Sequence, residues 1–143
     1  MSKAKVLFLC TGNSARSQMA EAFLKKHGGD RYDAYSAGTK PGGINPYTER
    51  VMEEVGVSLS GQYSKHVKEY MGRIHFPYVI SLCDAAEESC PAIFPGIGQR
   101  LHWPFEDPAA FVKSDDEKLA KFREVRDQIE RRIKEWLDDQ QGE

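Results

Sequence analysis

Short apolar runs and amphipathic stretches alternate along this chain, as they do in proteins built from strands and helices in turn. Apolar runs predict strands over residues 6–9, 32–37 and 78–82, and a weaker one over 101–103. Helical spacing of apolar side chains predicts helices over about 17–28, 45–56 and 115–137, and a short one over 64–71. Strands that alternate with helices pair in parallel, so we expect a parallel sheet covered on both faces.

The predicted helices carry signals at their ends or along one face. Gly28-Gly29 stops the first helix, and Asn45-Pro46 gives the second a cap and a first-turn proline. The last helix has an apolar stripe formed by Leu119, Phe122, Val125, Ile129, Ile133 and Trp136 or Leu137. We interpret this stripe as core packing rather than as a partner-binding face.

Length and composition restrict the class of protein. We expect residues 1–143 to form one domain, a monomer by default for this size. A net charge of −2, with both signs mixed among 29% charged residues, argues against nucleic acid or an anionic membrane as a partner. No apolar run reaches the length of a membrane span, and the run at 6–9 is too short for a signal peptide. We therefore expect a cytoplasmic protein.

The three cysteines favour thiol chemistry over a structural role. Their number is odd and their spacing fits no zinc site, and cytoplasmic thiols stay reduced unless they do redox work. The four histidines also lack metal-ligand spacing. The sequence predicts neither a metal site nor a cofactor.

Cys10 is the most informative residue, because it ends the first strand and Arg16 follows it at the start of a helix. A thiol over a helix N-terminus and beside a guanidinium is expected to favour its thiolate form. The loop amides would form an anion nest, and the arginine fork would hold two oxygens. We expect the oxyanion to be bound by Thr11, Gly12, Asn13, Ser14, Ala15, Arg16 and Ser17. The alternative is a buried cysteine before an ordinary strand-to-helix turn.

Displacement at Cys10 needs a proton for the leaving oxygen, and Asp107 is the candidate general acid. It lies on a loop after the weak last strand and is held by Pro108. Glu106 is an alternative donor, and an Asp-Pro pair also occurs at ordinary turns and helix starts.

Cys83 ends another strand, so parallel pairing would bring it to the same sheet edge as Cys10. Cys90 follows seven positions later, which in a continuous helix would separate the Cα atoms of Cys83 and Cys90 by about 10 Å. A disulfide needs about 7 Å or less, so this segment would have to bend. We interpret Cys83 and Cys90 as a redox pair, with two unrelated core residues as the alternative.

Residues 6–21, with the sequence VLFLCTGNSARSQMAE, resemble the signature of the low-molecular-weight tyrosine phosphatase superfamily. They are most similar to its thioredoxin-coupled arsenate reductase branch. The resemblance continues in Tyr35-Ser36-Ala37-Gly38, Asn45-Pro46, the Cys83 to Cys90 segment, His102-Trp103 and Asp107-Pro108-Ala109. It implies an α/β fold of three layers, with a four-stranded parallel sheet flanked by helices.

The resemblance also implies a reaction. Cys10 would attack arsenate held by Arg16, while Asp107 protonates the departing oxygen. Cys83 would then attack the adduct, releasing arsenite and leaving a Cys10–Cys83 disulfide. Cys90 would convert this to a Cys83–Cys90 disulfide, which thioredoxin reduces. Phosphate and sulfate would compete as oxyanions.

Some positions depart from the family pattern. Ala15 replaces a second in-loop cysteine, and residues 109–111 (Ala-Ala-Phe) replace the tyrosines that phosphatases carry after Asp-Pro. The second change weakens the case for an aromatic phosphoester substrate.

Position 65 differs as well. Some reductases bind potassium near the loop through residues equivalent to Asn13, Glu21 and Ser36 and an acidic residue near 65. This chain has Lys65, whose ammonium is expected to replace the ion, so we predict no potassium dependence.

Two other functions are consistent with the sequence. One is a phosphatase in which water resolves a phosphocysteine and Cys83 and Cys90 are incidental or protective. The other is an oxyanion-binding regulatory domain with little turnover. Weak phosphatase activity is expected even of a reductase, because the same loop accepts phosphate.

Overall fold

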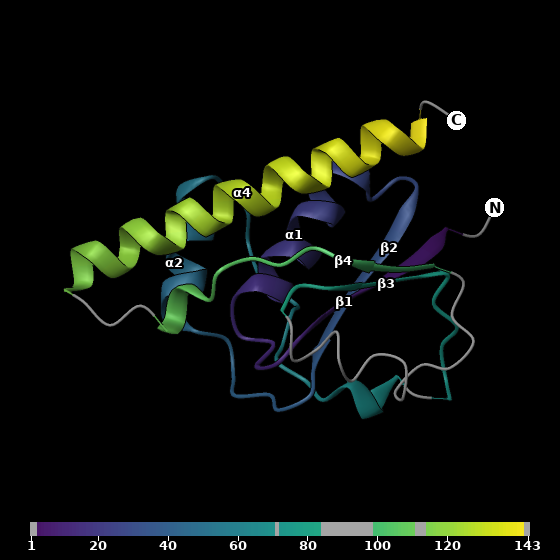
Figure 1. Ribbon diagram of the computed structural model, residues 1–143, viewed down its shortest axis with the longest axis horizontal. Coiled ribbons are helices and arrows are strands. Elements are labelled where there is room, and N and C mark those ends of the chain that lie inside the picture. Colours follow the sequence, from purple (N-terminus) through teal and green to yellow (C-terminus); the bar gives the residue numbers. More distant parts are fainter. Residues whose placement is uncertain (1–2, 71, 84–98, 111–113, 142–143) are drawn as a thin grey trace.

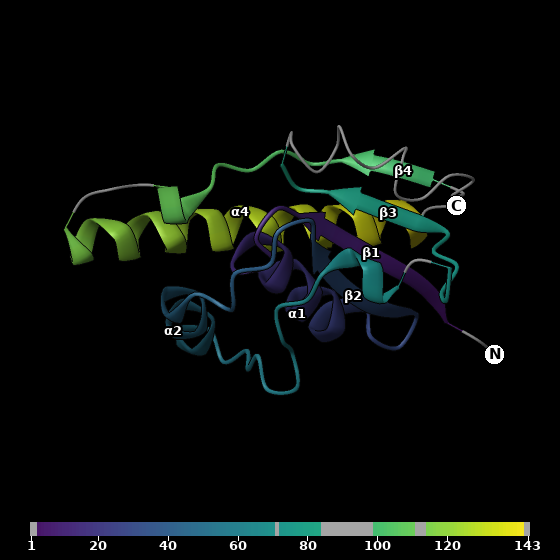
Figure 2. The same ribbon diagram turned by 90° about the horizontal axis from the view of Figure 1, so that it is seen from below.

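Four parallel strands form the centre of the protein. The computed structural model describes residues 3–70, 72–83, 99–110 and 114–141. Within these ranges the strands are β1 (Ala4–Cys10), β2 (Tyr32–Gly38), β3 (Tyr78–Ser81) and β4 (Gln99–His102). They pair in parallel in the order β2-β1-β3-β4, which can be followed in Figure 2. The predicted four-stranded parallel sheet is confirmed.

The described helices are α1 (Arg16–Gly28), α2 (Pro46–Glu54) and α4 (Asp115–Gln141), with 3₁₀ turns η1 (Val67–Glu69) and η2 (Pro108–Ala110). The predicted cap of α2 is confirmed, because the Asn45 side chain accepts a hydrogen bond from the backbone N–H of Tyr47 at 2.9 Å.

The short helix expected over 64–71 is wrong in extent, because only η1 forms among the residues described there. Before η1 the chain is extended along the end of β2. The backbone N–H of Gly38 donates to the Lys65 carbonyl at 2.9 Å, and Gly38 forms a parallel bridge with His66. Pairing with the strand therefore prevents residues 64–66 from coiling.

The two faces of the sheet bury different apolar clusters. Val6 and Phe8 join the larger cluster, together with side chains of α1, α2 and α4. The alternating residues Leu7 and Leu9 pack in a second cluster with Val67 of η1. In Figure 1 the three α-helices accordingly lie on one side of the sheet and η1 on the other.

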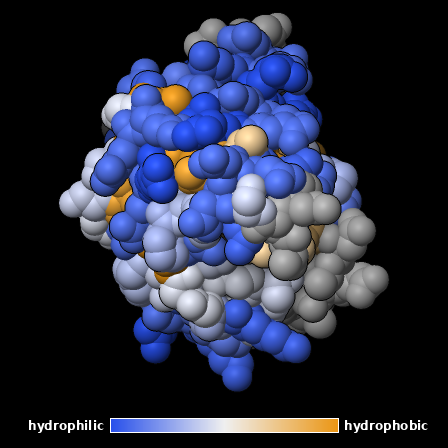
Figure 3. Space-filling model, turned by 90° about the vertical axis from the view of Figure 1, so that its left-hand side faces the viewer, coloured by the Kyte–Doolittle hydropathy of each residue, from blue (hydrophilic) through white to orange (hydrophobic). Residues whose placement is uncertain are grey.

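The apolar stripe of α4 is core, as predicted. Ile129 and Ile133 are fully buried, and the remaining members are at most 4% exposed. The end of the molecule that carries α2 and the start of α4 shows a mainly hydrophilic surface with small, separate hydrophobic spots (Figure 3). None of the helices described has both the length and the apolar composition that a bilayer span requires.

Parallel pairing places the carboxyl ends of β1 and β3 side by side. Leu9 is opposite Ser81, and the backbone N–H of Leu82 donates to the Leu9 carbonyl at 2.9 Å. Cys10 and Cys83 follow directly and emerge at one edge of the sheet, as the sequence predicted.

Candidate active site

The loop between β1 and α1 turns through Asn13, which adopts a left-handed backbone conformation with φ of 48°. Its buried side chain fixes this turn. Nδ2 donates to Ser17 Oγ at 2.8 Å and to Ser36 Oγ at 3.0 Å, and Oδ1 accepts from the Lys65 backbone N–H at 3.0 Å. Contacts from α1, β2 and the segment before η1 therefore converge on this one residue.

The loop between β1 and α1 packs directly on the backbone of β2 at Gly38. A Cβ atom at this position would lie 2.5 Å from the Thr11 carbonyl oxygen and 3.0 Å from Asn13 atoms. No side chain fits there, so glycine allows the loop to rest directly on the strand.

Carbonyl groups of the loop are bound by the segments around it. Lys40 N–H donates to the Thr11 carbonyl at 2.9 Å, and Asn45 N–H donates to the Ser14 carbonyl at 3.0 Å. In contrast, the backbone N–H groups of Ser14, Ala15 and Arg16 have no acceptor within the described chain. Amides at a helix N-terminus whose carbonyls are already bound form a nest for an anion.

Two thiols meet at this loop. Cys10 is 2% exposed and Cys83 is 9% exposed, and neither is part of a disulfide. The sulfur of Cys83 also lies 3.3 Å from the Thr11 hydroxyl oxygen, so Thr11 ties the second cysteine to the loop of the first. No local pattern in the sequence predicted this contact, because threonines are common in such turns.

The pKa of the Cys10 thiol is raised, mainly by its hydrogen bond with Cys83 and by burial. The Arg16 guanidinium and the Asn13 backbone N–H act in the opposite direction but do not prevail. The sequence-based expectation of a thiolate at Cys10 is therefore wrong for the thiol pair. That expectation took account of Arg16 and of the helix N-terminus, but not of a second thiol that shares the Cys10 proton.

Arg16 is 8% exposed, and its guanidinium is bound by the segment that follows β4. Its Nη1 donates to the Phe105 carbonyl oxygen at 3.1 Å, and its Nη2 lies 3.6 Å from Asp107 Oδ2. The guanidinium therefore joins the loop to the segment that carries the candidate general acid.

The structure separates the two acidic candidates. Asp107 faces Arg16, and its Oδ1 accepts the Ala109 backbone N–H at 3.0 Å, so it also caps η2. Glu106 points to α4, where its Oε1 accepts from Lys121 Nζ at 3.3 Å. Only Asp107 of this pair is placed beside the loop.

Behind the loop lies a polar layer centred on Ser36. Its hydroxyl donates to Glu21 Oε1 at 2.5 Å, and its carbonyl accepts from Lys65 Nζ at 3.0 Å. Burial lowers the pKa of Lys65, although the charge of Glu21 raises it. The Lys65 side chain thus lies in the polar layer behind the anion loop, which comprises residues 11–17.

Gln18 is a further member of this layer that the sequence did not reveal. It is fully buried at the start of α1, and its Nε2 donates to the carbonyls of Asn13 at 3.0 Å and Tyr63 at 3.1 Å. Glutamine inside a predicted helix carries no signal of such a role. Among the described residues, histidine, cysteine and acidic side chains do not gather in groups of three or more that could hold a metal ion.

Comparison with known proteins agrees with this geometry. A family model described as low molecular weight phosphotyrosine protein phosphatase matches residues 5–143. The chain belongs to this family. Within it, the chain is 44% identical over 138 residues to an arsenate reductase of Halalkalibacterium halodurans, covering 96% of this chain and 98% of that one.

Solved structures of family members have the same fold. An arsenate reductase in the phosphate binding state superposes with a TM-score of 0.76 and 32% identity, over 95% of this chain and 98% of that chain. A thioredoxin-dependent arsenate reductase of Corynebacterium glutamicum superposes with a TM-score of 0.72 and 28% identity, over 99% of this chain and 64% of that chain.

Proposed function

We propose that this protein reduces arsenate to arsenite, with Cys10 as the attacking nucleophile and Cys83 as the second thiol. The observation that carries the proposal is the contact between these two buried thiols at the mouth of an anion nest. A phosphatase needs one sulfur in this position, whereas a reduction by two electrons needs two. A relative named arsenate reductase, at 44% identity, supports the same choice of substrate.

In the first step the anion is held by the loop amides and by Arg16, which also stabilises charge that develops on its oxygens. The Cys10 sulfur attacks arsenic, a sulfur–arsenic bond forms, and one arsenate oxygen leaves as water. Asp107 gives a proton to that oxygen, because its Oδ2 lies 3.6 Å from Nη2 of Arg16, the residue that holds the anion. In this scheme the Cys10 proton passes to a bound arsenate oxygen.

In the second step Cys83 attacks the Cys10 sulfur. A disulfide forms, the sulfur–arsenic bond breaks, and its electron pair stays on arsenic, which leaves as arsenite. The Thr11 hydroxyl, 3.3 Å from Cys83 Sγ, is placed to orient this sulfur and to stabilise its thiolate.

The third step restores the site. We propose that Cys90 attacks Cys83, releases the Cys10 thiol, and presents a Cys83–Cys90 disulfide to thioredoxin. Cys90 lies outside the described residues, so this step is supported by the sequence and by the thioredoxin dependence named for the C. glutamicum relative. We expect the cycle to operate in the cytoplasm, where thioredoxin systems keep thiols reduced.

A phosphatase is the second candidate, because the anion nest, Arg16 and Asp107 would also serve phosphocysteine chemistry. The test is a coupled assay with arsenate, thioredoxin, thioredoxin reductase and NADPH, run beside hydrolysis of p-nitrophenyl phosphate. We expect arsenate-dependent NADPH oxidation in the wild-type chain, and mass spectrometry of trapped enzyme should recover a Cys83–Cys90 peptide pair.

The Cys83→Ser variant separates the functions. A reductase loses arsenite formation but keeps slow phosphoester hydrolysis, whereas a phosphatase forms no arsenite even in the wild type and hydrolyses phosphoesters with or without Cys83. Anion binding without turnover in either assay would instead identify a regulatory domain. Either of the last two results would refute the proposed reductase.

A further inference from the structure

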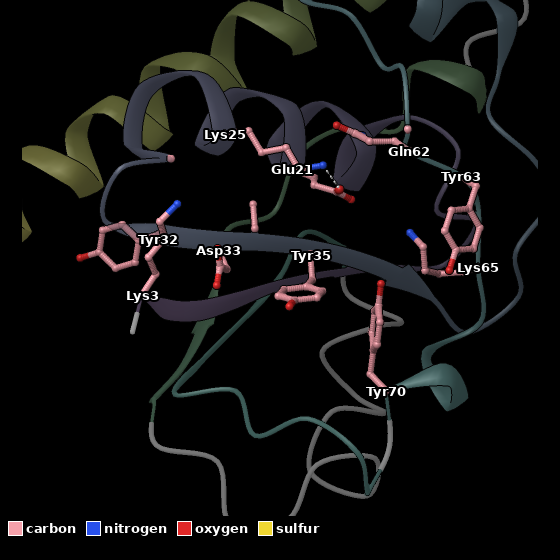
Figure 4. Close-up of a pocket in the computed structure, with 13 residues that line it drawn as sticks. Lys3, Glu21, Lys25, Tyr32, Asp33, Tyr35, Gln62, Tyr63, Lys65 and Tyr70 are labelled. Carbon is pink, nitrogen blue, oxygen red and sulfur yellow. Dashed lines mark hydrogen bonds and ion pairs between the residues drawn. The ribbon is translucent and has the colours of Figure 1, made fainter. Parts of the chain in front are cut away.

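A cavity of about 550 Å³ lies beside the outer edge of β2 and is lined by no residue of the anion loop. Figure 4 shows side chains from α1, β2 and the segment around residues 62–70 directed toward it. Its walls include the rings of Tyr35, Tyr63 and Tyr70, and its polar groups include Glu21 and Lys65. The reaction proposed above uses none of these side chains as a reacting group.

Lys65 is the unusual member of this set. The residue is 4% exposed, and its Nζ makes one hydrogen bond, to the Ser36 carbonyl at 3.0 Å, within the described chain. It also lies 4.4 Å from the centre of the Tyr63 ring. No described carboxylate approaches it closely enough to form an ion pair. An ammonium has three donors, so at least one remains for a ligand in the cavity.

Of the described residues, two acidic side chains line the cavity, Glu21 and Asp33, and neither forms an ion pair with Lys65. Asp33 Oδ2 lies 3.8 Å from Lys5 Nζ. Glu21 is already bound by Lys25 Nζ at 2.6 Å and by the Ser36 hydroxyl at 2.5 Å. The described lining carries three lysines, Lys3, Lys25 and Lys65, against these two carboxylates, which leaves an excess of one positive charge. The cavity therefore favours a single negative charge, and the nearby carboxylate disfavours a dianion such as phosphate.

The remaining walls indicate what carries that charge. Figure 4 shows the rings of Tyr63 and Tyr70 on either side of Lys65, with the Tyr70 hydroxyl directed toward the cavity. This hydroxyl donates to no acceptor in the described chain, and burial raises the pKa of Tyr70, so it stays a neutral donor. Aromatic walls with a donor and a cation at one end suit a small apolar or aromatic acid.

We propose that this cavity binds a small organic monocarboxylate, whose carboxylate pairs with Lys65 and the Tyr70 hydroxyl while its apolar part lies against the tyrosine rings. The inference is independent of the proposed reductase activity. The backbone N–H of Lys65 donates to Asn13 Oδ1 at 3.0 Å. A ligand bound to the Lys65 side chain would therefore lie on a residue that contacts the anion loop directly.

The test uses benzoate as the probe and benzamide as its neutral counterpart, titrated into the ¹⁵N-labelled full chain. We expect saturable shifts of backbone amides in residues 62–70 and in β2 with benzoate, and none with benzamide. The shifts should persist when saturating phosphate occupies the anion loop. Shifts that centre on residues 11–17 and disappear with phosphate would overturn the proposal, as would the absence of saturable binding.

Two variants and a matched control complete the test. Lys65→Met should weaken benzoate binding about tenfold or more, because a charged hydrogen bond is lost, and Tyr70→Phe should weaken it several-fold. Lys68→Met removes an exposed lysine three residues away and should bind as the wild type does. If Lys65→Met does not fold, the wild-type shift map and Tyr70→Phe decide the matter. Equal affinity in the folded variants and the wild type refutes the site.

Discussion

Cys83 lies against Cys10 at the adjoining ends of β3 and β1, and its hydrogen bond is the largest cause that raises the pKa of the Cys10 thiol. The residue that is proposed to attack the Cys10–arsenic adduct therefore also raises the pKa of the Cys10 thiol, against the effect of Arg16. This couples the two cysteines before any chemistry begins.

The first prediction follows from this contact. Cys83→Ala removes both the hydrogen bond and the second sulfur charge, so the pKa of Cys10 should fall, since Arg16 and the Asn13 amide still favour the thiolate. Alkylation of the Cys10 peptide by iodoacetamide, followed by mass spectrometry across pH, measures this. A midpoint for Cys10 at the same or higher pH in the variant would contradict the assigned cause.

Arg16→Lys should lower kcat/KM for arsenate by roughly 10²–10³-fold, a loss comparable to removal of one oxyanion donor. A lysine supplies the charge without the planar fork and without the bond to the Phe105 carbonyl. Arg123→Lys is the matched control, because Arg123 forms its forked pair with Glu54, away from the loop. Equal losses in both variants would show that Arg16 acts only through stability.

Asp107→Asn should reduce turnover by roughly 10²–10⁴-fold if the carboxyl protonates the leaving oxygen. In the phosphatase assay the loss should be larger for phenyl phosphate than for p-nitrophenyl phosphate, whose leaving group needs less help from a proton. Glu106→Gln should change either rate little, since that side chain binds Lys121. Equal losses of rate for the two phosphoesters would refute the role of Asp107 as general acid.

Potassium should not stimulate the wild-type enzyme, because the Lys65 ammonium already donates to the Ser36 carbonyl beneath the loop. Rates in potassium chloride and in choline chloride at equal ionic strength test this directly. Lys65→Gln removes a positive charge near the buried carboxylate of Glu21, which is bound by Lys25, so potassium should raise Tm more than it does in the wild type. Stimulation of wild-type turnover by potassium would disprove that the Lys65 ammonium takes the place of the ion.

Acid should weaken the attachment of α4 to α2 through Glu54. Hydrogen bonds from Arg123, then from Arg126, lower the pKa of Glu54 from 4.5 to about 2. Because the folded pKa lies below the unfolded one, the contribution is complete above pH 4.5 and is lost as the pH falls toward 2. Urea unfolding should show Glu54→Gln less stable than wild type at pH 7, with the difference shrinking by pH 3. Glu49→Gln, on the same helix, is the control.

Much of this protein could be predicted from sequence because local signals and tertiary demands agree. The four strands, the Asn45 cap and the buried stripe of α4 depend on periodicity and capping alone. Cys10 and Cys83 share one sheet edge for the same reason, since strands paired in parallel end on one side.

The remainder depended on contacts that no local pattern encodes. The direction of the Cys10 pKa shift is set by a thiol 73 positions away, and the Asn13 turn by Ser36 and Lys65. Residues 64–66 pair with β2 although their sequence permits a helix. Each of these is a case in which a distant partner outweighs local preference.

The left-handed turn at Asn13 is fixed by bonds that the protein itself supplies, from Ser36, Lys65 and Gln18. The amides of the loop are therefore oriented during folding, and an arriving anion does not have to organise them. Such preorganisation spares the ligand an entropic penalty and lets more of its binding free energy appear as affinity. It also means that substitutions in this supporting layer should alter oxyanion recognition without touching a single atom of the substrate.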